Sequence, residues 1–408
     1  MSVARAPGAV TPERVVEAEP KSEVMALQMG PSHPASHGTI KFNLRLDGET
    51  ILDVDVEIGY LHRGFEKMCE QGTWNHVFPY ADRLNYASPL LNNVGFALAV
   101  EQLAGITAPE RCQYIRVITG EMSRVTDHLT CLGMAANEIG AISAGFYMLE
   151  AREFLYDLVE AVTGARLTVT YCRLGGVVKD LPADMAERTR FALKQIRRVL
   201  ADCDRLLSRN RIFVDRMVGV GKLAQADAIS WGLTGPLLRA TGVPYDVRKA
   251  EPYLVYDRMD FEVPTGTSGD NYDRFMVRFA ELEQSMRIIE QALARIPPGP
   301  ILADDPRFVL PPKQEVYTTI EGLMNHFKLV MEGQKVPAGE VYMATEGGNG
   351  ELGFYLVSDG SGRPYRVRVR PPCFYGMAAL GEMLRGHMLA DIITTFGQIN
   401  MIGGECDR

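Results

Sequence analysis

The chain has 408 residues, of which 46% are hydrophobic and 23% are charged. These fractions are typical of soluble folded domains and argue against a disordered, collagen-like or coiled-coil chain. The formal net charge is -8, from 43 Lys and Arg against 51 Asp and Glu. A nucleic-acid partner is therefore disfavoured, because phosphate neutralisation requires a basic face.

Residues 1–22 are rich in Ala, Pro, Glu and Val without a hydrophobic period, and we interpret them as a mobile N-terminal arm. They lack the apolar core of a signal peptide. The longest apolar stretch, residues 86–100, contains Asn92 and Asn93 and is shorter than the roughly 18 residues of a membrane span. We expect a peripheral protein on the cytoplasmic side of the membrane.

Strict alternation of apolar and polar residues predicts two strands, at residues 39–47 and 52–58, on either side of Asp47-Gly48. A turn of this composition between two such strands is a hairpin signature. We therefore expect residues 23–85 to form an antiparallel β region, together with the loops that carry candidate site residues.

From residue 86 the hydrophobic period becomes helical, and we expect residues 86–408 to be a helical core in one unit with residues 23–85. The longest helix is predicted to open with a capping box, Thr107-Ala108-Pro109-Glu110, and to bury a stripe from Ile115 to Ile139. Further helices are expected at roughly 88–104, 143–163, 184–208, 272–296, 315–332 and 375–396.

Two other segments of this core are distinctive. Residues 232–270 are dense in Gly and Pro and too long for an ordinary loop, so we expect them to be functional or packed on the core. Residues 354–357 and 365–370 are predicted to form a C-terminal β-hairpin. The seven cysteines are an odd number and none form a C-x-x-C pair, which indicates scattered buried thiols and not a disulfide framework or a local metal clip.

The segment GPSHPASHG, residues 30–38, places His33 and His37 four residues apart. On a helix they would share a face, but Pro34 and the flanking glycines favour a loop. A zinc site is weakly supported, because the acidic partner of H-E-x-x-H is missing and no third ligand is specified. From the residues alone, an ordinary loop histidine is the stronger interpretation.

Long strings of the sequence resemble the family of the D-type (49 kDa, quinone-site) subunit of respiratory complex I, the NADH:quinone oxidoreductase. The resemblance covers the chain from residue 24 onward. It is carried by GPSHPASHG at 30–38, IGYLHRGFEK at 58–67, PYADRLNY at 79–86, GLTGPLLRATGVPYDVRKAEPY at 232–253, GDNYDRFMVR at 269–278 and GELGFYLVSDGSGRPYR at 350–366. It implies a mainly α protein with small antiparallel β-sheets (α+β), similar to the large subunit of nickel-iron hydrogenases.

Hydrogenase activity is the competing enzyme hypothesis. It requires two C-x-x-C motifs whose thiolates hold the metal pair, and neither is present: the early position, around His62-Arg63-Gly64, has no such pair, and only Cys406 lies near the end. We therefore expect no metal site in this chain. The resemblance implies a quinone pocket in its place.

The family places a histidine and a tyrosine at the quinone head group, and these match His37 and Tyr86. Both side chains can donate protons to a reduced quinone and be reprotonated. The resemblance assigns His33 and Arg83 to the same quinone-binding pocket. The carboxylate that pairs with the histidine, usually Asp, aligns with Glu138, and we expect it to take part in catalysis as a proton relay.

The resemblance implies that electrons reach quinone, the substrate, from an iron-sulfur cluster in an adjacent B-type subunit, while this chain alone binds no cofactor and is inactive. Arg63 and Arg166 match family positions near that cluster. The usual histidine after the second arginine is Thr168, which predicts a flatter pH dependence of the cluster potential. The usual C-terminal aspartate is Asn400, so its carboxylate role is not transferred.

Further partners implied by the resemblance are a C-type subunit, other subunits of the peripheral arm and a membrane-arm subunit at the quinone entrance. The expected function is quinone reduction by electrons from NADH, coupled to proton translocation at the bacterial cell membrane. A ferredoxin-driven relative and a non-catalytic scaffold role stay open as alternatives. Ubiquinone and menaquinone are both compatible with the sequence.

Overall fold

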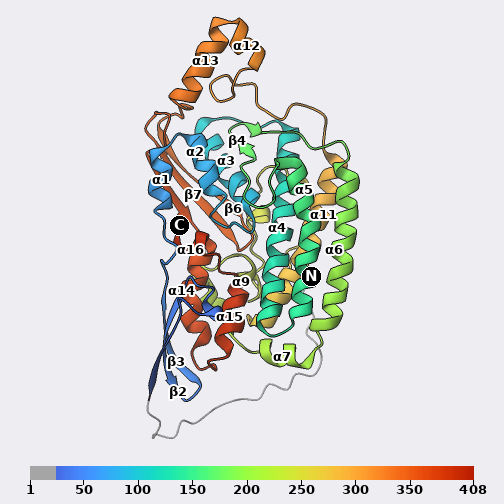
Figure 1. Cartoon of the computed structure of the whole chain (residues 1–408), viewed down its shortest axis with the longest axis vertical. Helices are drawn as coiled ribbons and strands as arrows, with labels where there is room; N and C mark the ends of the chain where they lie inside the picture. The colour runs from blue at the N-terminus through green and yellow to red at the C-terminus, as the bar shows by residue number, and fades with distance from the viewer. Residues whose placement is uncertain (1–23) are drawn as a thin grey trace.

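The computed structural model describes residues 24–408, so the arm predicted over residues 1–22 lies outside the described residues. Helices dominate, and small antiparallel sheets lie along one side of them (Figure 1). This arrangement confirms the predicted fold class, a mainly helical α+β protein. Within residues 24–408, no helix combines the length and apolar character needed to cross a membrane.

The first sheet has three antiparallel strands in the order β1-β2-β3. Their bounds are β1 (Met25–Met29), β2 (Lys41–Asp47) and β3 (Thr50–Glu57). β2 and β3 form the predicted hairpin, with Leu44 opposite Val54. β1 is not predicted, because its short sequence shows no sustained alternation. Phe42, Leu44 and Leu46 of β2 are buried in a hydrophobic cluster shared with the C-terminal helices.

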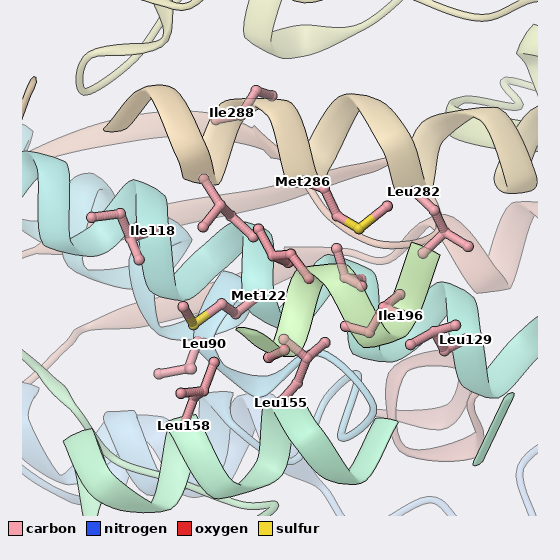
Figure 2. Close-up of a cluster of buried hydrophobic side chains, with 14 of the residues drawn as sticks. Leu90, Ile118, Met122, Leu129, Leu155, Leu158, Ile196, Leu282, Met286 and Ile288 are labelled. Atoms are coloured by element: carbon pink, nitrogen blue, oxygen red, sulfur yellow. The ribbon is translucent and has the colours of Figure 1, made fainter. Parts of the chain in front are cut away.

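The largest core lies in a bundle of long helices (Figure 1). They are α4 (Glu110–Glu138), α5 (Ile142–Thr163), α6 (Met185–Leu207) and α11 (Asn271–Arg295). α4 packs against both α5 and α11, and the residues of its predicted apolar stripe from Ile115 to Ala136 are buried. Figure 2 shows Ile118, Met122 and Leu129 of α4 lying between side chains of α5 and α11.

The predicted capping box at the start of α4 is wrong. The helix begins at Glu110, its cap is Pro109, and no side chain caps it. Proline has no N–H and fixes the backbone just before the helix, so it displaces Thr107 from the capping position.

The turn between α4 and α5 depends on a close backbone contact. Added to Gly145, a Cβ atom would lie 2.8 Å from the carbonyl oxygen of Gly133. A side chain here would push the two helices apart, so both glycines are needed for this packing. The contact lies near Glu138 and fixes where the end of α4 is held against α5.

A second three-stranded sheet packs on a buried helix. It has the order β6-β7-β8 and contains β6 (Gly339–Glu346), β7 (Glu351–Ser358) and β8 (Arg366–Arg370). β7 and β8 form the predicted C-terminal hairpin. The covering helix is α3 (Pro89–Ala104), whose Phe96 ring lies edge-on to Phe354, with centroids 5.8 Å apart.

The remaining elements are short. They are α1 (Phe65–Gln71), α2 (Trp74–Ala81), α7 (Arg211–Met217), α8 (Gln225–Ser230), α9 (Gly235–Arg239), α10 (Val247–Ala250), α12 (Lys313–Thr318), α13 (Ile320–Met331), α14 (Pro372–Leu384), α15 (Asp391–Ile399), α16 (Gly403–Asp407), the 3-10 turns Pro34–Ser36 and Tyr256–Arg258, and the strand pair β4 (Cys172–Arg173) and β5 (Gly176–Val177). The seven cysteines are buried and free, as predicted.

Several of these elements differ from the expected pattern. α1 and α2 occupy a region expected to be strands and loops, because helices of seven or eight residues are too short to show a clear period. The helix expected at 315–332 is interrupted at Thr319, which has extended backbone and caps α13. The helix expected at 375–396 is divided into α14 and α15, because Arg385 is extended.

The segment 232–270 packs on the core, as predicted, through buried charges. Arg239 at the end of α9 donates to the carboxylates of Glu281 at 2.6 Å and Glu346 at 2.8 Å. All three side chains are buried. Their mutual pairing offsets the cost of removing each charge from water.

Candidate functional site

The first part of the site is the loop between β1 and β2, which holds both candidate histidines. Pro34–Ser36 form a single 3-10 turn, and Nδ1 of His33 accepts a hydrogen bond from the Ala35 N–H at 3.2 Å. The Ser36 hydroxyl donates to the His33 carbonyl oxygen at 2.9 Å. The segment is therefore a loop, as predicted, and the His33 ring caps its turn.

The structure brings His37 and Glu138 together. Nε2 of His37 lies 2.5 Å from Oε1 of Glu138, and their side chains are 37% and 13% exposed. The ring also packs against Phe396 of α15, with centroids 4.9 Å apart. Glu138 is the last residue of α4, where the negative end of the helix dipole adds to the carboxylate charge. The carboxylate of Glu138 and the ring of Phe396 therefore hold the exposed imidazole at the end of α4.

A glycine makes room for the Glu138 side chain. A Cβ atom on Gly397 would lie 2.0 Å from Oε2 of Glu138. That oxygen is buried and has no hydrogen-bond partner within the described part of the chain. The Glu138 side chain is thus accommodated by the missing side chain at residue 397.

Tyr86 lies on the loop after α2, and 41% of the residue is exposed. Burial of its phenol raises its pKa above the ordinary value, and the negative charge of Asp127 acts in the same direction. Among residues 24–408, no side chain or backbone group forms a hydrogen bond with its hydroxyl. The phenol is therefore a protonated, unengaged donor at neutral pH.

The loops that carry His37 and Tyr86 meet at the glycine pair that begins α16. A Cβ atom on Gly403 would lie 2.4 Å from Leu61 Cδ1 and 3.6 Å from Thr39 Cγ2. One on Gly404 would lie 2.5 Å from the Arg83 carbonyl oxygen and 3.6 Å from the Tyr86 ring. No hydrogen bond or ring contact joins His37 to Tyr86 directly in the described residues; the chain from Phe396 to Gly404 contacts both of their loops.

A buried carboxylate supports the Tyr86 loop. Asp127 of α4 accepts hydrogen bonds from Asn85 at 2.8 Å, Ser88 at 3.0 Å and Asn400 at 2.9 Å. Asn400 acts here as a donor. Its side-chain N–H₂ group donates one hydrogen bond to Asp127 and another to Asn349, the latter at 2.7 Å. An aspartate at this position would replace that donor with a second carboxylate facing Asp127.

The three candidate arginines occupy two connected segments. Arg63 donates to the Arg83 carbonyl oxygen at 3.0 Å, and Arg83 itself donates to the Pro79 carbonyl oxygen at 2.5 Å. Burial lowers the pKa of Arg63 below its ordinary value. The other segment, which contains Thr168, is linked to this one by the hydrogen bond from Thr170 to Asp82, at 2.9 Å.

Arg166 lies in the second segment and faces the acidic side of α5. It pairs with Glu153, and its guanidinium lies 3.7 Å from Asp157 and 3.8 Å from Glu160. Within residues 24–408, no hydrogen bond or ion pair joins it to the segment that holds Arg63. The two arginines therefore lie in separate segments, which the hydrogen bond from Thr170 to Asp82 connects.

Four exposed apolar side chains lie on the last turns of α4 and the first turns of α5. Met134 precedes Glu138 by one helical turn, and Ile142, Phe146 and Tyr147 follow on α5. All four are exposed, Phe146 to 65%. Exposed apolar side chains that gather on one surface commonly mark a binding site, because their contact with water is unfavourable.

Sequence reasoning missed the residues that support this pair. Phe396 lies at the end of the predicted C-terminal helix, and no function is predicted for its ring or for Gly397. Asp127 lies inside the predicted helix over residues 107–139, and no function is predicted for it either. The glycine pair in INMIGGECDR is a usable signal, because adjacent glycines often mark a close backbone approach. Within residues 24–408, no group of three or more His, Cys, Asp or Glu side chains is placed to hold a metal ion.

Known proteins share this sequence along most of its length. A family model described as "Respiratory-chain NADH dehydrogenase, 49 Kd subunit" matches residues 138–408. The D-type subunit, form 1, of the NADH-quinone oxidoreductase of Sorangium cellulosum (strain So ce56) is 60% identical over 388 residues, which cover 95% of this chain and 96% of that protein. The D-type subunit from Myxococcus xanthus (strain DK1622) is 55% identical over 396 residues, 97% of this chain and 95% of that protein.

A third relative contains an additional part. The fused C/D-type subunit of the NADH-quinone oxidoreductase of Bdellovibrio bacteriovorus (strain ATCC 15356 / DSM 50701 / NCIMB 9529 / HD100) is 50% identical over 384 residues, which cover 94% of this chain and 69% of that protein. These matches extend over nearly the whole chain. The chain therefore belongs to the family of the 49 kDa subunit of respiratory-chain NADH dehydrogenase, whose fold is similar to the nickel-iron hydrogenase large subunit.

Proposed function

We propose that this chain forms the quinone-reduction site of a proton-translocating NADH:quinone oxidoreductase, together with an adjacent iron-sulfur subunit. The observation that carries the proposal is the 2.5 Å contact between His37 and Glu138 at the exposed end of α4. An imidazole held by a carboxylate can give a proton to a substrate oxygen and then be reprotonated. Its exposed position leaves it accessible to a ligand.

Quinone reduction requires two electrons and two protons, and the reduced ring oxygens are strong bases. The exposed imidazole of His37 and the free phenol of Tyr86 would supply one proton each to the two oxygens. Glu138 would hold the imidazole in place and stabilise its positive charge. Arg83, beside the Tyr86 loop, would help to bind the head group, and His33 would keep the histidine loop in its observed turn.

The apolar patch of Met134, Ile142, Phe146 and Tyr147 supports a lipid-soluble substrate, because an isoprenoid tail would cover such side chains. The same patch suits contact with a membrane-arm subunit at the quinone entrance. We place the chain on the cytoplasmic face of the cell membrane as a peripheral subunit.

Electrons would arrive from the cluster of the neighbouring subunit, near Arg63 and Arg166, whose positive charges favour the reduced cluster. The three relatives named as NADH-quinone oxidoreductases support NADH as the electron source over ferredoxin. The fused C/D-type relative supports a C-type subunit as a neighbour. Coupling of this reaction to proton pumping belongs to the assembled complex, and the chain alone would be inactive.

The proposal is tested in the intact complex with His37→Ala and Tyr86→Phe. Each should reduce quinone reductase activity at least about 100-fold, the range of a lost general acid, while oxidation of NADH by an artificial acceptor continues. The matched controls are His326→Ala on α13 and Tyr317→Phe on α12, which lie outside the site. Normal quinone reduction in both site variants would reject the assignment and favour a scaffold role.

A further inference from the structure

Tyr86 is the second residue of a four-residue turn whose two ends are held by one buried carboxylate. The Ser88 N–H donates to the Asn85 carbonyl oxygen at 3.2 Å and closes the turn, and the Ala87 N–H donates to the Asn85 side chain at 3.1 Å. The side chains of Asn85 and Ser88 both donate to Oδ2 of Asp127, at 2.8 Å and 3.0 Å. The backbone on either side of Tyr86 is therefore fixed to Asp127 of α4.

The other oxygen of Asp127 is bound by Asn400. Asp127 is fully buried, and no Lys, Arg or His in the part of the chain that the structure describes forms an ion pair with it. Its Oδ1 atom accepts a hydrogen bond from the Asn400 amide at 2.9 Å, and the same amide donates to Asn349 at 2.7 Å. A buried carboxylate without a cation is stabilised by its hydrogen-bond donors. Asn400 is therefore one of the three groups that hold Asp127 as an anion.

Asn400 belongs to the helix that also holds the candidate histidine. It is the C-cap of α15 and has a left-handed backbone, with φ 55°, a conformation that asparagine adopts more readily than most residues. One turn earlier, the Phe396 ring packs on His37 with centroids 4.9 Å apart, and Gly397 leaves room for the carboxylate that pairs with that histidine. The end of α15 therefore contacts the histidine pair with one turn and the support of the Tyr86 turn with the next.

We propose that Asn400 is a positioning residue: it ties the Tyr86 turn to the helix that holds His37, so that the two proton donors keep one fixed arrangement. This inference rests on the proposed quinone chemistry, in which both donors reach oxygens of the same head group. Asn400 acts through Asp127 and does not touch the substrate. Without its N–H groups the Tyr86 turn loses its link to α15, and a donor displaced by about 1 Å costs about 100-fold in rate.

The first test removes the side chain and keeps the backbone. Asn400→Gly retains the left-handed conformation, which glycine adopts without steric cost, and deletes the amide that donates to Asp127. In the intact complex we expect quinone reductase activity to fall about 100-fold. Oxidation of NADH by an artificial acceptor, which reports assembly and electron entry, should continue.

The second test exchanges donor and acceptor. In Asn400→Asp two buried carboxyl groups face each other, and they cannot both be ionised because like charges at this distance repel. At low pH a shared proton replaces the amide N–H, so activity should fall more steeply with rising pH than in the unmodified complex. The double variant Asp127→Asn, Asn400→Asp again pairs one amide with one carboxylate and should recover both activity and the original pH profile. Asn325→Asp on α13, outside the site, is the matched control.

The titratable groups around this pair are the same in every variant, so they do not distinguish one pH profile from another. They face Asp127 or Asn400 from four helices and from the turn itself: His128 and Cys131 of α4, Tyr156 of α5, Cys373 of α14, Glu405 of α16 and Tyr86. Only the exchange of Asn400 and Asp127 alters the number and place of the carboxyl groups.

The exchange separates a positioning role from a general requirement for the fold. The inference is overturned if Asn400→Gly reduces quinone normally, if Asn400→Asp shows the pH profile of the unmodified complex, or if the double variant is no more active than Asn400→Asp. Loss of both assays in Asn400→Gly and in the double variant overturns it too, because that result shows a need of the fold alone. If Tyr86→Phe is inactive while Asn400→Gly is normal, only this inference fails; if Tyr86→Phe is active, the proposed function fails as well.

Discussion

The most informative perturbation is Gly397→Ala, because it adds a single methyl group against the Glu138 carboxylate. The new Cβ would lie 2.0 Å from Oε2, well inside contact distance, so the carboxylate must move away and its 2.5 Å contact with His37 is lost. A hydrogen bond between charged groups contributes about 1.5–3 kcal/mol. Replacing glycine by alanine inside a helix stabilises the folded state by roughly 0.5–1 kcal/mol, which partly offsets this loss. The net loss of stability is therefore about 0.5–2.5 kcal/mol.

The effect on activity should be much larger than the effect on stability. A reacting group displaced by about 1 Å costs about 100-fold in rate, so quinone reductase activity of the complex should fall by that factor while reduction of an artificial acceptor is retained. The rescue variant is Gly397→Ala combined with Glu138→Asp, whose shorter side chain withdraws from the new methyl group. The steric argument is refuted if Gly397→Ala keeps full activity, or if the double variant is no more active than Gly397→Ala alone.

Three other outcomes follow from the buried charges and from the segment that we propose to lie near the partner's cluster. Arg239→Met should destabilise the complex by about 3–5 kcal/mol, seen as a lower thermal midpoint, whereas Arg258→Met at an exposed pair should cost less than about 1 kcal/mol. Burial raises the pKa of Asp82 to about 7, above the roughly 3.9 of an unfolded aspartate. Between roughly pH 4 and 7 the folded protein therefore keeps a proton on Asp82 that the unfolded chain releases, so the free energy of unfolding falls as pH rises through this range. Asp82→Asn should make thermal stability less dependent on pH there. Thr168→His should steepen the pH dependence of the cluster's midpoint potential; a full one-proton slope between about pH 6 and 8 in the unmodified complex would contradict this reasoning.

The long helices are predictable because their cores follow a simple period. The stripe from Ile115 onward on α4 is buried as expected, since a helix packed on two neighbours needs apolar residues every three or four positions. The strands β2 and β3 are predictable for the corresponding reason with a period of two. Short elements such as α1 and β1 are not, because tertiary contacts and not local pattern determine them.

The candidate site is predictable only as a set of residue types. Resemblance to a family selects His37 and Glu138, and the structure places them in contact. Nothing local in the sequence indicates that Gly397, far along the chain, must lack a side chain for that contact to form. Nor does the sequence show that Asn400 donates to Asp127, since a hydrogen-bond direction depends on which groups the fold brings together.

The backbone contact between Gly133 and Gly145 has a consequence for mutational surveys of this chain. Neither glycine has a side chain to offer a substrate, yet together they determine how the last turns of α4 rest on α5 and hence where Glu138 ends up. Random variants at Gly145 should therefore lose both stability and turnover, because the clash with the Gly133 carbonyl oxygen displaces the end of α4. A survey that measures turnover alone would therefore misidentify Gly145, which determines helix packing, as a catalytic residue.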